Sequence, residues 1–214
     1  MRTRVKICGL TCAENIADAC SLGADAIGLV FYPKSSRYIT ADNAALLRSK
    51  VPAFVSVVAL FVNPTESYVR KVLNLVKPCI LQFHGDESPE FCSKFGVPYI
   101  KSFGIGSKTS NTPFDVYQMV KPYNTACGWL FDTYTPGFGG SGKLFNHDLL
   151  TAVLSSQESK PIILAGGLNP DNVKEAILKS KPYAVDVSSG VESNPGLKNY
   201  NLMEKFMLSV KQSA

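Results

Sequence analysis

The 214-residue sequence predicts an α/β fold, a single-domain (β/α)₈ barrel of the TIM type, on three observations. Short apolar segments rich in Val, Ile and Phe recur eight times, as is typical of parallel strands covered on both faces. Stretches with helical spacing separate these segments, and Gly recurs where the segments end. Because no linker, low-complexity tract or tandem repeat interrupts the pattern, one domain is expected over residues 1–214.

The expected strands and helices alternate along the chain. A doubly wound open sheet is the alternative architecture, but it usually contains fewer strands. The expected strands are Val5–Gly9, Ala26–Tyr32, Val55–Val62, Ile80–Gly85, Tyr99–Ile105, Gly128–Thr133, Pro161–Gly167 and Ala184–Gly190. The helices with clear start signals are Asn15–Leu22 after Thr11, Asp42–Ser49 after Thr40, Thr65–Val76 after Asn63-Pro64, and Asp171–Ser180 after Asn169-Pro170.

The charge balance is compatible with a small anionic ligand. Lys and Arg total 22 against 17 Asp and Glu, a net charge of +5, and hydrophobic residues make up 45% of the chain. The charges are scattered, so no nucleic-acid partner is expected. The N-terminal MRTRVKICGL has no apolar core of the kind found in signal peptides, and no segment is apolar and long enough to span a membrane.

The cysteines indicate a reducing compartment. The six cysteines form no CxxC pair and no metal-ligand spacing with the two histidines. A chain of this size without a secretory signal does not need a disulfide framework. We therefore expect free thiols, no metal and a cytoplasmic location.

Candidate catalytic residues lie where the strands end, because the loops after the strands form the active-site face of this barrel. Cys8 ends the first strand, and Lys6 lies on the same face two residues earlier. A neighbouring ammonium lowers the pKa of a thiol, so Cys8 can act as a general base; a buried apolar role is the alternative. Asp132 closes an apolar run, where desolvation would raise its pKa towards that of a useful acid, and a capping role is the alternative.

Glycines at the ends of the last two strands predict a phosphate site. Gly166-Gly167 and Ser189-Gly190 allow backbone N–H groups to approach an anion closely, at the place where this fold usually binds phosphate. Asn194-Pro195-Gly196 is a candidate start for a short helix that would add its dipole. The alternative is that these glycines serve only tight turns.

Further polar residues at the strand ends are candidate substrate ligands. Arg37 can make a bidentate contact to a carboxylate, although an exposed surface role competes. Gln82 and His84 share one face of the fourth strand, where a lone His is more often a hydrogen-bonded structural residue than a catalyst. Asp186 is either a further polar member of the site or a structural anchor, and His147 is expected to be exposed to solvent.

The Gly-rich run 137–143, GFGGSGK, fits two nucleotide-binding patterns, GxGxxG and GxxxxGK. The residue after Lys143 is Leu144, which cannot hold Mg²⁺ as a P-loop Ser or Thr does. The run also follows the sixth strand rather than the first, and the next probable helix starts only at His147. A mobile lid over a barrel active site fits this context better.

Taken together, the motifs resemble those of the phosphoribosylanthranilate isomerase family over essentially the whole chain. The KICG near the N-terminus and the DVSSGVE near the C-terminus are the most selective. The motifs are KICGLT (6–11), FYPKSSRYI (31–39), LFVNP (60–64), QFHGDE (82–87), FDT (131–133), GGSGK (139–143), LAGGLNPDNV (164–173) and AVDVSSGVE (184–192).

The resemblance implies a step of tryptophan biosynthesis, the Amadori rearrangement of N-(5-phosphoribosyl)anthranilate to 1-(2-carboxyphenylamino)-1-deoxyribulose 5-phosphate. It implies Cys8 as the base, Asp132 as the acid and Arg37 as the ligand of the anthranilate carboxylate. Gln82, His84 and Asp186 would contact the substrate, and no cofactor is implied. The phosphate ligands implied are Gly166, Gly167, Ser189 and Gly190.

Departures from the family pattern lie outside the acid and base, at Leu144, Asn146, His147, Leu197 and Asn199. The properties that these departures put in question are loop closure and phosphate affinity, not the reaction itself. The related histidine-pathway isomerase, which resembles this fold but uses two aspartates, is an alternative, as are an inactive sugar-phosphate binder and a P-loop nucleotidase. We expect a monomer, with a homodimer as the alternative.

Overall fold

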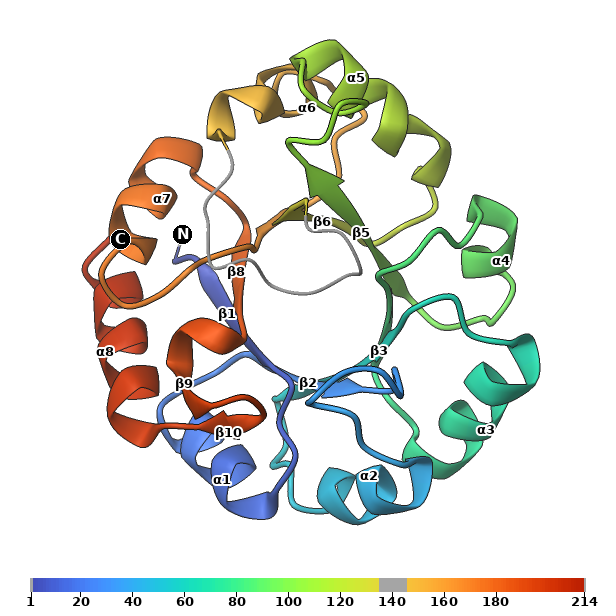
Figure 1. Cartoon of the computed structure of the whole chain (residues 1–214), viewed down its shortest axis with the longest axis vertical. Helices are drawn as coiled ribbons and strands as arrows, with labels where there is room; N and C mark the ends of the chain where they lie inside the picture. The colour runs from blue at the N-terminus through green and yellow to red at the C-terminus, as the bar shows by residue number, and fades with distance from the viewer. Residues whose placement is uncertain (1, 135–145, 214) are drawn as a thin grey trace.

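Eight parallel strands close into a barrel in sequence order, each hydrogen-bonded to the next and β8 to β1, as the sequence predicts (Figure 1). The structure, a computed structural model, describes residues 2–134 and 146–213. The strands mostly end one to three residues earlier than expected, and after β1 and β7 the chain turns at glycines with left-handed φ, Gly9 and Gly166. They are β1 (Arg4–Cys8), β2 (Ala26–Val30), β3 (Ser56–Phe61), β4 (Ile80–Phe83), β5 (Tyr99–Ile105), β6 (Gly128–Thr133), β7 (Ile162–Leu164) and β8 (Ala184–Val187).

Side chains alternate between the helix-facing layer and the barrel interior, because successive residues of a strand point to opposite faces. Val5 and Ile7 of β1 join the large core between the strands and the helices. Lys6 and Cys8 of the same strand face inwards, where Lys6 stands in register with Asp186 of β8. The interior is therefore filled by both apolar and charged side chains, and its polar members point towards the site.

The helices surround the barrel (Figure 1). Thr side chains cap the starts of several of them. Thr40 and Thr65 accept backbone N–H bonds at the starts of α2 and α3, and Thr112 forms a capping box with Asp115. The helices are α1 (Ala13–Ser21), α2 (Ala41–Arg48), α3 (Glu66–Val76), α4 (Pro89–Ser93), α5 (Pro113–Val120), α6 (Thr151–Leu154), α7 (Val173–Ser180) and α8 (Tyr200–Lys211), with 3₁₀ turns η1 (Lys121–Tyr123), η2 (His147–Leu150) and η3 (Ser189–Val191).

The segment after β8 differs from the expectation. The predicted strand to Gly190 is too long, because the chain turns into η3 directly after β8. Asn194-Pro195-Gly196 does not open a helix, so that expectation is wrong. Gly196, with φ of 86°, instead forms the turn of a small antiparallel hairpin of β9 (Glu192–Asn194) and β10 (Leu197–Lys198). Thr11 holds this hairpin by donating a hydrogen bond to the Gly196 carbonyl at 3.0 Å.

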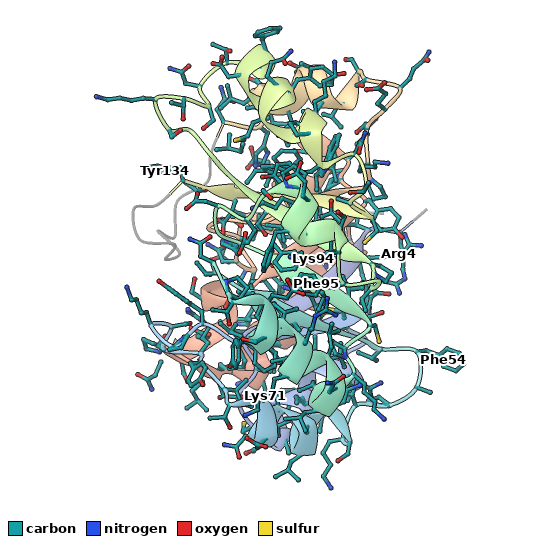
Figure 2. The ribbon with its side chains drawn as sticks, turned by 90° about the vertical axis from the view of Figure 1, so that its right-hand side faces the viewer. Arg4, Phe54, Lys71, Lys94, Phe95 and Tyr134 are labelled. Atoms are coloured by element: carbon teal, nitrogen blue, oxygen red, sulfur yellow. The ribbon has the colours of Figure 1, made fainter. Side chains whose placement is uncertain are left out.

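The two ends of the barrel carry opposite ends of the strands. In Figure 2, Arg4 at the start of β1 and the fully exposed Phe54 lie on one side, whereas Tyr134, which follows β6, lies on the other. The side of Tyr134 is thus the carboxyl end of the strands, where the site residues gather. Within the described residues, no helix has the length and apolar character needed to cross a membrane.

Candidate active site

A cavity of about 540 Å³ opens at the carboxyl ends of the strands. It has the size of a small-molecule site, and residues from seven of the eight strand ends, all but that of β5, contribute to its described wall. Gly190, one of the predicted phosphate ligands, is not among the described residues that line it. The predicted site residues that do line it are Cys8, Arg37, Gln82, His84, Asp132, Gly166, Gly167, Asp186 and Ser189.

Cys8 is buried, and charged side chains lie close to it. Its thiol is 4% exposed, and the Lys6 ammonium beside it donates to Asp186 Oδ1 at 2.9 Å. A Cβ added at Gly28 on the neighbouring strand would lie 2.7 Å from Cys8 Sγ and 3.1 Å from Lys6 Nζ. Gly28 therefore provides the space in which the thiol and the ammonium meet.

The pKa of Cys8 moves in the direction opposite to the expected one. Burial raises the pKa of the Cys8 thiol above 9.0; the Lys6 ammonium opposes this shift and the Asp186 carboxylate adds to it. The pKa of Lys6 is raised, because Asp186 and Cys8 together outweigh the effect of its own burial. The sequence identified the correct neighbour of Cys8, but desolvation of the closed barrel is the larger effect.

Asp132 has the properties of an acid near neutral pH. Burial, followed by the negative charge of Asp186, raises the pKa of Asp132 to about 6. A Cβ at Gly166 would lie 2.6 Å from Asp132 Oδ1 and 2.4 Å from the Thr133 nitrogen. The glycine after β7 therefore leaves room for the carboxyl group at the end of β6.

His84 contacts Asp132 and is held by Gln82. Its Nε2 lies 3.6 Å from Asp132 Oδ2, and burial lowers the pKa of His84 to about 4, helped by the charges of Lys101 and Lys6. The ring is therefore neutral at pH 7, and this contact is not an ion pair. The Gln82 amide nitrogen lies 3.3 Å from His84 Nδ1 and 3.1 Å from Ser102 Oγ. When the Gln82 amide donates to Nδ1, Nδ1 is the unprotonated nitrogen of the neutral ring. The ring proton then lies on Nε2, the nitrogen that faces the Asp132 carboxyl.

Arg37 reaches the cavity across the backbone of the first loop. Gly9 has a φ of 77°, and a Cβ there would lie 2.3 Å from Arg37 Cδ, so only glycine lets the arginine pass. Arg37 forms a bidentate contact with the carboxylate of Glu192, and its binding of a substrate carboxylate stays a prediction. Its Nε and Nη2 donate to Glu192 Oε1 and Oε2 at 2.7 and 2.6 Å.

The predicted phosphate ligands divide into two groups. Gly166 and Gly167, with left-handed φ values of 80° and 65°, and Ser189, at the start of η3, line the cavity. A Cβ at Gly190 would lie only 1.9 Å from the Leu168 carbonyl oxygen. Gly190 is therefore required for packing between the last two loops.

Sequence reasoning assigned no role to Glu192 and Lys198, which are polar residues behind the site. Lys198 Nζ donates to Glu192 Oε1 at 2.6 Å and to the Ser188 carbonyl at 3.1 Å. Glu192 belongs to a selective motif, but no spacing in the sequence connects it to Arg37. His147 was expected at the surface, yet it is 9% exposed and its Nδ1 contacts Ser180 Oγ at 2.9 Å. The proposed lid, residues 137–143, lies outside the described residues.

Comparison with known proteins agrees with this geometry. Residues 5–209 match the family described as N-(5'phosphoribosyl)anthranilate (PRA) isomerase. The N-(5'-phosphoribosyl)anthranilate isomerase of Bordetella avium is 52% identical and covers 99% of this chain and 97% of its own length. The crystal structure of phosphoribosyl anthranilate isomerase from Thermotoga maritima superposes with a TM-score of 0.88 at 39% identity, covering 98% and 99% of the two chains. Another such isomerase, in complex with reduced 1-(o-carboxyphenylamino)-1-deoxyribulose 5-phosphate, gives a TM-score of 0.84 at 35% identity, covering 98% and 99%.

Proposed function

We propose, because the chain belongs to the N-(5'-phosphoribosyl)anthranilate isomerase family, that it catalyses the Amadori rearrangement of N-(5'-phosphoribosyl)anthranilate in tryptophan biosynthesis. The product is 1-(2-carboxyphenylamino)-1-deoxyribulose 5-phosphate, so the reaction is an aldose–ketose isomerisation by general acid and base catalysis. The observation that carries this proposal is one cavity lined by both Cys8 and Asp132, next to a basic residue and a pair of left-handed glycines.

Asp132 is the proposed acid. It protonates the ring oxygen of the ribose, the C1–O bond breaks, and the electron pair of the aniline nitrogen forms a Schiff base. A carboxyl group with a pKa of about 6 can both hold this proton and release it near neutral pH. The neutral His84 beside it presents an N–H and adds no positive charge that would lower the pKa.

Cys8 is the proposed base. Its thiolate removes the proton from C2, giving an enolamine that tautomerises to the ketone. Because burial raises the pKa of Cys8, the thiolate is the minor form at rest. Lys6 is placed to stabilise that thiolate, and its own charge is anchored by Asp186. Asp186 is thus proposed as an anchor of the base as well as part of the cavity wall.

Arg37 and the last two loops are proposed to bind the two anionic ends of the substrate. Arg37 would hold the anthranilate carboxylate, as a guanidinium suits a planar two-oxygen group. Backbone N–H groups of Gly166, Gly167 and Ser189 would hold the phosphate. Gly190 would contribute mainly by keeping these two loops in contact. Gln82 and His84 complete the wall near the reacting atoms.

The proposed partner is a small phosphorylated sugar derivative. We propose a monomer, with a homodimer as the alternative that light scattering of the purified protein would reveal. All six cysteines are free, which supports a reducing, cytoplasmic location.

The decisive assay is the loss of phosphoribosylanthranilate fluorescence when purified protein is added. Rapid loss, with the isomerised product identified by mass and chromatography, supports the proposal. A folded protein that causes no loss contradicts it, and the aminoimidazole carboxamide ribotide of histidine synthesis is then the substrate to test.

A further inference from the structure

The guanidinium of Arg37 has two edges, and Glu192 occupies one of them. Nε and Nη2 form the side edge, and both donate to the Glu192 carboxylate at 2.7 and 2.6 Å. Five N–H groups are present on a guanidinium, so three donors on Nη1 and Nη2 are left for another acceptor. Arg37 lines the cavity, whereas Glu192 is not among the described residues of its wall. The edge available to a substrate carboxylate is therefore the end formed by Nη1 and Nη2.

Glu192 is itself held firmly. Its side chain is 5% exposed, and its Oε1 also accepts from Lys198 Nζ, a group whose side chain is fully buried. Lys198 Nζ also donates to the Ser188 carbonyl at 3.1 Å, and Ser188 Oγ donates to the Cys8 carbonyl at 3.1 Å. The hairpin of β9 and β10 thus connects Arg37 to the end of β1 through a chain of part-buried hydrogen bonds.

The charges in this cluster favour an incoming anion. Arg37 and Lys198 supply two positive charges and Glu192 one negative charge, which leaves one positive charge at the cavity wall. Arg37 is also fixed on its other side by Gly9, over which its stem passes. A guanidinium that is already oriented loses little conformational freedom when it binds a carboxylate.

We propose that Glu192 is a positioning residue that aims the end of Arg37 into the cavity and thereby makes the site select a substrate bearing an aromatic carboxylate. The inference rests on the proposed function, because it assumes that Arg37 binds the anthranilate carboxylate. It extends that function by assigning substrate selectivity to a residue of the β9–β10 hairpin that lies behind the cavity wall.

The test is binding of two stable analogues by calorimetry. One is reduced 1-(o-carboxyphenylamino)-1-deoxyribulose 5-phosphate, and the other is the same molecule without the carboxylate. Wild-type protein should prefer the carboxylated analogue by about tenfold or more. In Glu192→Gln this preference should fall by about tenfold, since an amide offers Arg37 only one oxygen and turns an NH₂ towards donors. Affinity for the decarboxylated analogue should stay within about twofold.

A second variant controls for a loss of stability caused by Glu192→Gln itself. Glu192→Gln leaves the buried Lys198 ammonium without its carboxylate, which destabilises the hairpin. The double variant Glu192→Gln/Lys198→Met removes both charges and should show the same loss of preference. Glu66→Gln is the matched control, because Glu66 on α3 also accepts from an arginine and a lysine, Arg70 and Lys94, but is 41% exposed.

The outcomes are distinct. If the folded variants bind both analogues more weakly by the same factor, Glu192 has only a structural role. If their preference for the carboxylated analogue is unchanged, Arg37 needs no partner. Either result overturns the inference. If wild-type protein neither turns over phosphoribosylanthranilate nor binds the carboxylated analogue, the proposed function fails first. Loss of preference in Glu66→Gln would also overturn the inference, because the effect would then not be specific to Arg37.

Discussion

Replacing Asp132 with Asn should make the protein more stable and nearly inactive. Because burial and Asp186 raise the pKa of Asp132 from 3.8 to about 6, the ionised carboxylate is disfavoured in the folded chain. A shift of this size corresponds to about 3 kcal/mol of unfolding free energy once the group is fully ionised. Asn has nearly the same shape and no proton to lose, so it avoids this penalty.

The direction of the pH dependence follows from proton binding. Between the unfolded pKa of 3.8 and the folded pKa of about 6, the folded chain binds more protons than the unfolded chain. The contribution of Asp132 to stability therefore falls as pH rises through this window and is constant above it. The advantage of Asp132→Asn should grow by about 2 kcal/mol between about pH 4.5 and about pH 8.

Urea denaturation of wild type and variant at several pH values measures this difference directly. Any change in hydrogen bonding caused by the amide is independent of pH. The pH-dependent part of the difference in unfolding free energy therefore reports the ionisation of Asp132 alone. Asp42→Asn on α2 is the control, because that side chain is 76% exposed. An advantage that stays constant within about 0.5 kcal/mol across the range would refute a raised pKa at Asp132. Turnover should fall by about two orders of magnitude or more, and a variant that isomerises at the normal rate would refute its role as the acid.

Three further predictions concern the same site. Cys8→Ala and Cys8→Ser should each lower kcat by about two orders of magnitude or more, as expected for loss of a general base, and a near-normal rate in Cys8→Ala would remove that assignment. Arg37→Ala should mainly raise KM for phosphoribosylanthranilate, so a loss confined to kcat would contradict carboxylate binding. The reactive form needs Asp132 protonated and Cys8 ionised, and the pKa of Asp132, about 6, lies below the raised pKa of Cys8. The fraction of this form, and with it kcat/KM, should therefore rise up to about pH 6, stay level, and fall only above the pKa of Cys8; a rising limb that ends near pH 4 would assign that limb to a group other than Asp132.

The sequence determined the architecture because the barrel is built from local signals. Short apolar runs, Thr at helix starts and Gly at strand ends are properties of a few neighbouring residues, and they placed the eight strands to within a few residues. They also placed Cys8 and Asp132 at the carboxyl ends of strands, where the cavity forms. The short helix expected at Asn194-Pro195-Gly196 failed because Pro and Gly serve a hairpin turn as well as a helix start.

Only the tertiary structure decided which charges meet. Lys6 and Asp186 are 180 positions apart and pair because β8 closes the barrel against β1. Arg37 and Glu192 are 155 positions apart and pair because the hairpin folds back over the first two loops. The sign of the pKa shift at Cys8 depends on how completely water is excluded from the thiol, since desolvation there exceeds the effect of the neighbouring ammonium. Local sequence patterns encode strands, helices and turns, whereas desolvation and long-range charge pairing exist only once the barrel has closed.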